Sequence, residues 1–248
     1  MATQVFCGAV QADAISSDIV GYTSQTLNDG FTTSVGTFVG VGAATDTMPI
    51  SSLAATATGL ASEGIAIQTL DEFGATAKIY LYITESDAVD YGLEGAGWID
   101  MDEYYGPAEK TFTAGEGFLV QNAYADGGIT CSGAVAKGAT EVVLNDGFTT
   151  SGNLNPESVN IQSIVATATG LASEGIAIQT LDEFGATAKI YLYITESDAV
   201  DYGLEGAGWI DMDEYYGPAE KTFTAGEGFL IQNAYADGAV TLPAVVVE

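Results

Sequence analysis

The segment IAIQTLDEFGATAKIYLYIT, residues 65–84, predicts a β-hairpin. Its strands, Ile65–Leu70 and Thr76–Thr84, are rich in β-branched and aromatic residues, and Asp71–Gly74 joins them through a glycine that tolerates positive φ. In the second strand, aliphatic residues alternate with tyrosines and polar residues. This period of two predicts one aliphatic face, which we expect to be the core, and one tyrosine face lying under a neighbouring sheet or subunit.

The hairpin lies in a segment that occurs twice. Residues 55–127 recur as residues 166–238, with 72 of the 73 positions identical. A shorter block, LNDGFTTS, occurs at residues 27–34 and again at 144–151. The chain is therefore predicted to contain two copies of one module, each long enough to form its own core.

The repeat divides the chain into four expected segments. They are an N-terminal strand or extension at 1–18, β module 1 at 19–128, a shared strand or linker at 129–141, and β module 2 at 142–248. Short strand candidates separated by Gly-rich turns predict an all-β fold, with each module an antiparallel β-sandwich or barrel.

Two local patterns add detail to each module. Thr84–Asp87 resembles a capping box, which predicts one short helix ending at Gly92. Lys110–Thr113 and Gly117–Asn122 flank a short Gly-containing turn and predict a final hairpin.

The composition is strongly acidic and excludes several classes of function. The chain has 34 Asp and Glu against 5 Lys, with no Arg and no His, so its formal net charge is −29. Nucleic acids and anionic membrane surfaces should be repelled, and no apolar run is long enough to span a membrane. Without His or Arg, we predict no catalytic residues, no cofactor-binding residues and no enzymatic activity.

The densest acidic cluster is a candidate calcium site. Carboxylates alternate before a glycine, and Ca²⁺ prefers six to eight oxygen ligands, although the twelve-residue calcium loop is incomplete. The alternative is a solvated acidic turn. The candidate ligands are Asp100, Asp102 and Glu103, repeated as Asp211, Asp213 and Glu214.

Aromatic residues beside this cluster predict a second kind of site. Trp98 with Tyr104, and Trp209 with Tyr215, are candidates for a platform that holds a sugar ring. The alternative is that these residues anchor the core or an interface.

Three apolar segments mark the module boundaries: Val5–Val10, Ile129–Val135 and Val240–Val247. We expect the first segment of one chain to complete an open sheet edge near the last segment of the next, by β-strand addition. Cys7 and Cys131 occupy similar positions in the first two segments, which leaves open a disulfide or two buried thiols. The predicted assembly residues are Val5, Phe6, Cys7, Val10, Cys131, Val240, Leu242, Val245 and Val247.

Three Gly-based pieces carry a resemblance to a known group of proteins. Ile19–Tyr22, Leu27–Phe31 and Ala114–Asn122 resemble the repeats of exported surface proteins from Verrucomicrobia-like bacteria, in which similar motifs bracket a β module. The resemblance implies an exported, repeat-built β protein. Residues 12–14 (Ala-Asp-Ala) look like a signal cleavage site, but Met1–Ala14 lacks a basic region, so we take this segment as mature chain.

These features together predict a structural function. Near-identical copies suit a polymer, in which every copy of a repeated surface is used equally. We expect a self-assembling subunit of an extracellular filament or surface layer that polymerises head to tail with copies of itself. The alternative is a tandem cell-surface adhesin or carbohydrate-binding module.

Overall fold

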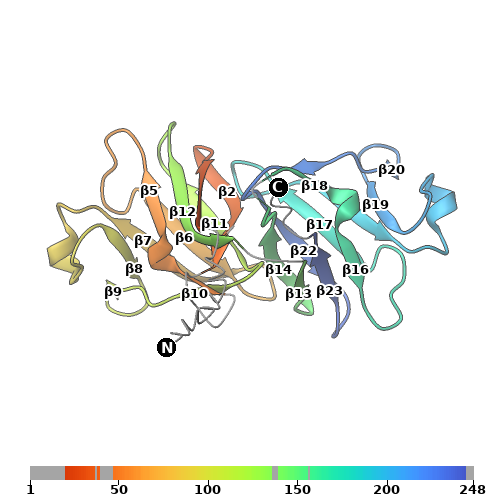
Figure 1. The fold of residues 1–248 in the computed structure, drawn as a ribbon, viewed down its shortest axis with the longest axis horizontal. Coiled ribbons are helices and arrows are strands. Elements are labelled where there is room, and N and C mark those ends of the chain that lie inside the picture. The colour runs from red at the N-terminus through yellow and green to blue at the C-terminus, as the bar shows by residue number, and fades with distance from the viewer. Residues whose placement is uncertain (1–19, 37, 40–46, 136–138, 156, 244–248) are drawn as a thin grey trace, which may run out of the picture.

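The computed structural model describes residues 20–36, 38–39, 47–135, 139–155 and 157–243. Figure 1 shows two β modules side by side along the long axis of the molecule. Their strands pair antiparallel, and the helices are short 3-10 turns. The predicted all-β fold with two tandem, near-identical modules is confirmed.

The main layer of module 1 is a six-stranded sheet built around the predicted hairpin. The hairpin strands, β6 (Ile65–Leu70) and β7 (Thr76–Ile83), pair directly with each other. The sheet order is β2-β11-β6-β7-β8-β9. Its other strands are β2 (Gly30–Val35), β8 (Gly97–Asp100), β9 (Gly106–Pro107) and β11 (Gly117–Asn122).

A smaller second layer covers one face of this sheet. In it, β12 pairs with β1, β3 and β5, while β4 pairs with β10 and leads into the 3-10 turn η1. The bounds are β1 (Val20–Thr26), β3 (Phe38–Val39), β4 (Thr47–Pro49), η1 (Ile50–Ser52), β5 (Leu53–Thr56), β10 (Thr111–Thr113) and β12 (Gly128–Val135).

Module 2 repeats this plan. Its sheets have the orders β14-β22-β17-β18-β19-β20, β13-β23-β16 and β15-β21. The bounds are β13 (Thr140–Val143), β14 (Gly147–Gly152), β15 (Val159–Asn160), η3 (Ile161–Ser163), β16 (Val165–Thr167), β17 (Ile176–Leu181), β18 (Thr187–Ile194), η4 (Ala199–Tyr202), β19 (Gly208–Asp211), β20 (Gly217–Pro218), β21 (Thr222–Phe223), β22 (Gly228–Asn233) and β23 (Ala239–Leu242).

The main core lies on the tyrosine face of the hairpin, which is buried under the second layer, as predicted for a neighbouring sheet. Tyr80 and Tyr82 are buried in one cluster with Leu53 of the second layer. The Tyr82 hydroxyl is hydrogen-bonded to the backbone of Ala55. The aliphatic face of β7 carries only a smaller cluster: Ile83 is fully buried and Leu81 half-buried, and in module 2 Leu192 and Ile194 belong to a separate core cluster. Tyrosine serves as a core residue here because its ring is largely apolar and its hydroxyl finds a polar partner.

Two local predictions are corrected. The 3-10 turn η2 (Ala88–Tyr91) ends at Gly92 as expected, with φ +72°, but its N-cap is Asp87 and no side chain caps it. The predicted capping box is therefore absent. In addition, β10 and β11 do not form a hairpin, because β10 pairs with β4 and β11 pairs with β2 and β6.

The boundary between the modules falls after β12. Within the described part of the chain, β12 pairs only with strands of module 1, and β13 opens module 2. Residues 129–141 thus include two successive strands from different sheets. The strand at the end of module 2, β23, lies between β13 and β16 and is paired on both sides.

The modules meet through reciprocal backbone contacts near the centre of the molecule, where β2 and β14 approach each other (Figure 1). The Phe31 N–H donates to the Glu183 carbonyl oxygen at 2.9 Å, and the Phe148 N–H donates to the Glu72 carbonyl oxygen at 2.8 Å. The phenylalanines occupy the same position of the LNDGFTTS repeat, and the glutamates occupy the same position of the hairpin turn. This reciprocity relates the modules by an approximate two-fold rotation.

Glycine permits this close approach. Gly30 and Gly147 have φ of +119° and +117°, a region that L side chains rarely adopt. A Cβ atom at Gly30 would lie 2.2 Å from the Glu183 carbonyl oxygen, and one at Gly147 would lie 2.1 Å from that of Glu72. Any larger residue would push the modules apart.

Gly30→Ala and Gly147→Ala are each expected to lower the free energy of unfolding by about 2 to 4 kcal/mol, because backbone strain adds to a clash between modules. Gly59→Ala is the matched control, since its φ is +70° but a Cβ atom there would meet nothing within 4 Å. It should cost only about 1 kcal/mol. Chemical denaturation measures all three, and equal losses would contradict the close packing at the junction.

Candidate functional site

Both tryptophans are core residues, which corrects the predicted glycan platforms. Trp98 is only 3% exposed, and its indole N–H donates to the Leu53 carbonyl oxygen at 2.8 Å. Its ring packs edge-on against Tyr82, with centroids 5.0 Å apart, and Trp209 is buried in the same way. A buried ring cannot stack on a sugar, whereas Tyr104 remains fully on the surface.

The acidic cluster is partly neutralised from within the module. Asp100 is buried and its carboxylate lies 2.7 Å from the Lys78 ammonium, while Glu103 lies 3.8 Å from the same group. The Asp102 N–H donates to the other Asp100 oxygen at 2.9 Å. The hydrogen bond to Asp100 raises the pKa of Lys78. In module 2, the same pairing joins Lys189 to Asp211 at 2.8 Å and to Glu214 at 3.5 Å, beside Asp213.

Within the described ranges, no three His, Cys, Asp or Glu side chains are arranged to hold a metal ion. A cation at Asp100 would also compete with the ammonium of Lys78. The calcium site at Asp100, Asp102 and Glu103 stays a prediction.

The predicted assembly residues fall into two groups. Val240 and Leu242 are buried in β23, and Cys131 is buried in β12, where its thiol lies 3.2 Å from the sulfur of Met48. These side chains belong to the module cores. The remaining residues lie outside the described ranges; they are Val5, Phe6, Cys7, Val10, Val245 and Val247.

A cleft lies at the outer end of module 1. It has a volume of about 450 Å³ and is lined by Glu63, Asp90, Tyr91, Tyr104 and Tyr105. The 3-10 turn η2 supplies one tyrosine and the aspartate, and the turn between β8 and β9 supplies the other two tyrosines. Figure 1 shows η2 at one end of the long axis and its counterpart η4 at the other.

The cleft combines aromatic rings with negative charge. The Tyr91 hydroxyl donates to the Glu63 carboxylate at 2.9 Å, and this hydrogen bond raises the pKa of Tyr91. The Tyr202 hydroxyl makes the same bond to Glu174 at 3.0 Å in module 2, with the same effect on its pKa. Each tyrosine therefore stays a neutral hydrogen-bond donor that holds a carboxylate in place.

Three residues that line the cleft adopt a backbone conformation that disfavours side chains. Glu63, Tyr104 and Tyr105 have φ of 68°, 54° and 59°. Left-handed backbone costs about 1 to 2 kcal/mol for residues other than glycine. Tyr104 is fully exposed and Tyr105 is 46% exposed, so burial of these rings does not offset that cost. The equivalent residues Glu174, Tyr215 and Tyr216 have φ of 67°, 55° and 58°.

The sequence identified only part of this site. The sequence pattern predicts that Tyr104 lies beside Trp98 of the preceding strand. In the structure, Tyr104 lines a cleft with Tyr91 and Glu63. The Glu63–Tyr91 contact joins residues 28 positions apart, which no local pattern predicts. The available clue was two tyrosines before Gly106 in a turn where Gly or Asn is usual.

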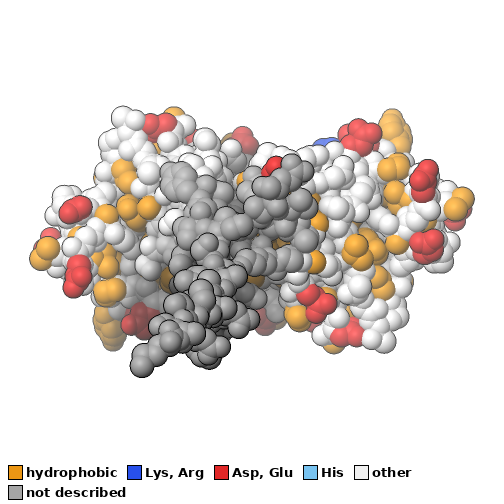
Figure 2. Space-filling view, in the orientation of Figure 1, with side chains coloured by type: hydrophobic (Ala, Val, Ile, Leu, Met, Phe, Trp, Pro, Cys, Tyr) orange, Lys and Arg blue, Asp and Glu red, His pale blue; other side chains and the backbone are white. Residues whose placement is uncertain are grey.

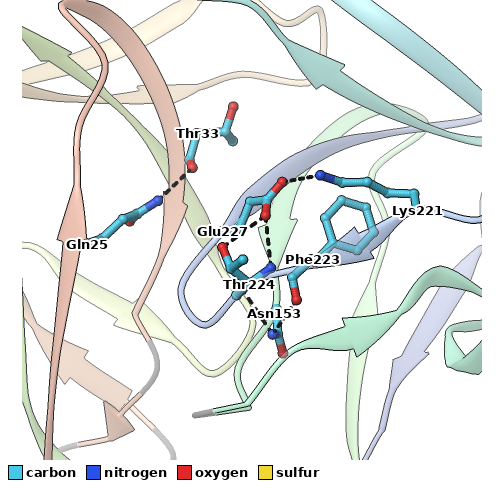
Figure 3. Close-up of polar contacts among 7 residues, drawn as sticks. All are labelled: Gln25, Thr33, Asn153, Lys221, Phe223, Thr224 and Glu227. Carbon is cyan, nitrogen blue, oxygen red and sulfur yellow. Dashed lines mark hydrogen bonds and ion pairs between the residues drawn. The ribbon is translucent and has the colours of Figure 1, made fainter.

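A second cleft, of about 560 Å³, lies between the modules. Figure 3 shows polar contacts in and beside this cleft. Gln25 donates to the Thr33 carbonyl oxygen at 3.4 Å, and Glu227 accepts from the Thr224 N–H at 2.8 Å and pairs with Lys221, which lies outside the cleft lining, at 2.5 Å. These bonds fix the chain beside the junction. We therefore assign this cleft to module packing.

The outer surface is acidic. Figure 2 shows Asp and Glu side chains at both ends of the face in view, with very little basic surface beside them. Among the described residues, no helix is long and apolar enough to cross a membrane.

The chain was compared with protein-family models, with curated proteins and with solved structures, and none of these comparisons finds a match. The resemblance to Verrucomicrobia-like surface proteins therefore stays a prediction.

Trp98→Ala is expected to lower the free energy of unfolding of module 1 by about 3 to 5 kcal/mol, because it leaves a large cavity and removes a buried hydrogen bond. Tyr104→Ala should change it by less than about 0.5 kcal/mol. Both are measured by chemical denaturation. Strong quenching of the wild-type tryptophan fluorescence by iodide would contradict the burial of the indoles.

Proposed function

We propose that this chain is a non-enzymatic, bivalent glycan-binding protein of the extracellular surface, with one binding site at each end. The observation that carries the proposal is a pair of consecutive, exposed tyrosines with left-handed backbone conformation, which occurs in both modules. Strained residues that contribute little to packing are typical of binding and catalytic sites. Glycine would adopt the same backbone conformation at a lower free-energy cost. A binding role for the tyrosine rings explains why tyrosine is present instead.

The lining of the cleft favours a neutral or amino-substituted sugar. Tyrosine rings pack against the apolar faces of a sugar ring and offer hydroxyl groups at their edges. The carboxylates of Glu63 and Asp90 accept hydrogen bonds from sugar hydroxyl or ammonium groups. A chain of net charge −29 should repel acidic glycans.

Module 2 repeats the tyrosines and carboxylates of this cleft at the opposite end, and two such sites suit a multivalent target. The cleft of module 1 is open and lined by few residues, so we expect weak binding at a single site. Simultaneous binding of both ends to one surface, or to two, increases the overall affinity without any new contact. This accounts for a chain that carries two near-identical copies.

The double variant Tyr104→Gly with Tyr215→Gly separates function from stability. Glycine relieves the left-handed strain but adds freedom to the unfolded chain, so the free energy of unfolding should stay level or rise by about 1 kcal/mol. Binding to a glycan array should fall at least tenfold, on the order expected for loss of an aromatic anchor. Calorimetry and array binding measure the two effects.

Tyr104→Phe with Tyr215→Phe is the matched control, since it keeps the rings and should retain most of the binding. Wild-type protein that binds no glycan on the array would refute the ligand class. Binding of simple organic ammonium ions that is lost at high salt would instead identify a cation site.

A second candidate is the self-assembling filament or surface-layer subunit, favoured by one sheet edge. β1 is seven residues long, and within the described ranges it pairs only with β12. Such an edge is a template for strand addition. The outer edges of the large sheets suit this less, because β9 and β20 are two residues long and end in Pro107 and Pro218.

Deletion of residues 1–14 tests assembly by strand addition. If this segment joins one chain to the next, negative-stain microscopy should show filaments or sheets for the full-length protein and single particles for the deletion variant. The Tyr104→Gly, Tyr215→Gly variant should still assemble, because its substitutions lie away from β1. Full-length protein that stays monomeric with added Ca²⁺ would contradict this candidate.

A further inference from the structure

The surface that joins the modules is made of sequence that each module carries in full. The LNDGFTTS block of module 1 contacts the hairpin turn of module 2, and the same block of module 2 contacts the hairpin turn of module 1. Phe31 lies 3.4 Å from the Cβ position of Gly185, and Phe148 lies 3.3 Å from that of Gly74. Each module therefore presents both halves of a self-complementary interface.

One residue pair breaks this symmetry. Val35 follows the block in module 1, whereas Gly152 occupies the same position in module 2. Val35 is buried in the core cluster of module 2, and its N–H donates to the Gly226 carbonyl oxygen at 3.1 Å. A Cβ atom at Gly152 would lie 2.7 Å from the Val35 side chain and 2.6 Å from the Glu227 carbonyl oxygen. Valine from one module thus fills the space that glycine leaves in the other.

A second difference points the same way. In module 1, the Ser34 hydroxyl donates to the Gln25 side chain at 2.5 Å. The position of Gln25 is taken by Val142 in module 2, and Ser151, the counterpart of Ser34, has no hydrogen-bond partner among the described residues. Val142 instead packs 2.5 Å from the Cβ position of Gly115 of module 1. The two halves of the interface are specialised for each other.

We propose that this surface is a self-recognition interface whose partner is a second module, and that Val35 and Gly152 make module 1 select module 2. Two copies of module 1 would bring valine against valine in a space that has room for one. Two copies of module 2 would leave that space empty. Both mismatches weaken like pairs, so mixed pairs form whether the modules belong to one chain or to two.

The test uses the full-length protein, folded first and then cut at a protease site introduced within residues 136–139. The cut protein is partly dissociated in mild denaturant and returned to buffer, and native mass spectrometry then counts the pairs, because the two modules differ in mass. We expect the wild-type modules to remain paired at micromolar concentration, with mixed pairs favoured about tenfold or more over random pairing.

Val35→Gly makes the two modules alike at this position and should bring the pairs close to random proportions. Val89→Gly is the matched control, because Val89 is 84% exposed on η2, and it should keep the wild-type preference. If Val35→Gly does not fold as judged by circular dichroism, Val35→Ala should show a smaller shift in the same direction.

Separation of the cut wild-type protein into single modules would overturn the self-recognition interface. Random pairing of the wild type, or an unchanged preference in the Val35 variants, would overturn the role of Val35 and Gly152. None of these outcomes depends on whether the end clefts bind glycans.

Discussion

The close backbone contact at Gly30 and Gly147 determines the arrangement of the whole chain. It brings the edge strands β2 and β14 to the centre of the molecule, so these edges are covered. The approximate two-fold rotation that it imposes carries η2 and η4 to opposite ends (Figure 1). This pair of reciprocal contacts thus covers the inner sheet edges and places the exposed tyrosines of both modules at the outer ends. Bivalent binding would follow from this geometry without any further specialisation of either module.

The repeat and the period-two alternation were enough to predict the fold class and the β6–β7 hairpin, because both are local properties of the sequence. The choice of core face was not predictable in this way. Alternation shows that β7 has two faces, but aliphatic and tyrosine residues are both apolar enough to be buried. The second layer decides between them, and its strands lie far from β7 in the sequence. The separation of β10 from β11 has the same cause, since each finds a better partner elsewhere.

The residues of the candidate site were likewise only partly predictable from local sequence. Tyr104 was identified because it follows an acidic and aromatic stretch. Its short distance from Trp98 in the sequence suggests a shared platform, although a strand residue three positions before a turn can face the core. Glu63 and Tyr91 join the site through tertiary contacts. At Tyr104 and Tyr105 the local backbone preference and the structure disagree, and this disagreement is the basis for the proposed binding role.

In the unfolded chain, β11 has two identical candidate partners. Its Asn122 faces Ile65 of β6, 57 residues earlier, while Ile176 of the identical β17 lies 54 residues later. Loop-closure entropy depends only weakly on length, so it differs by less than about 0.1 kcal/mol between these pairings. The strand contacts themselves are the same. During synthesis module 1 can complete its sheet before β17 exists, whereas refolding of the intact chain offers both partners at once. Synthesis from the N-terminus therefore favours pairing of β11 within its own module.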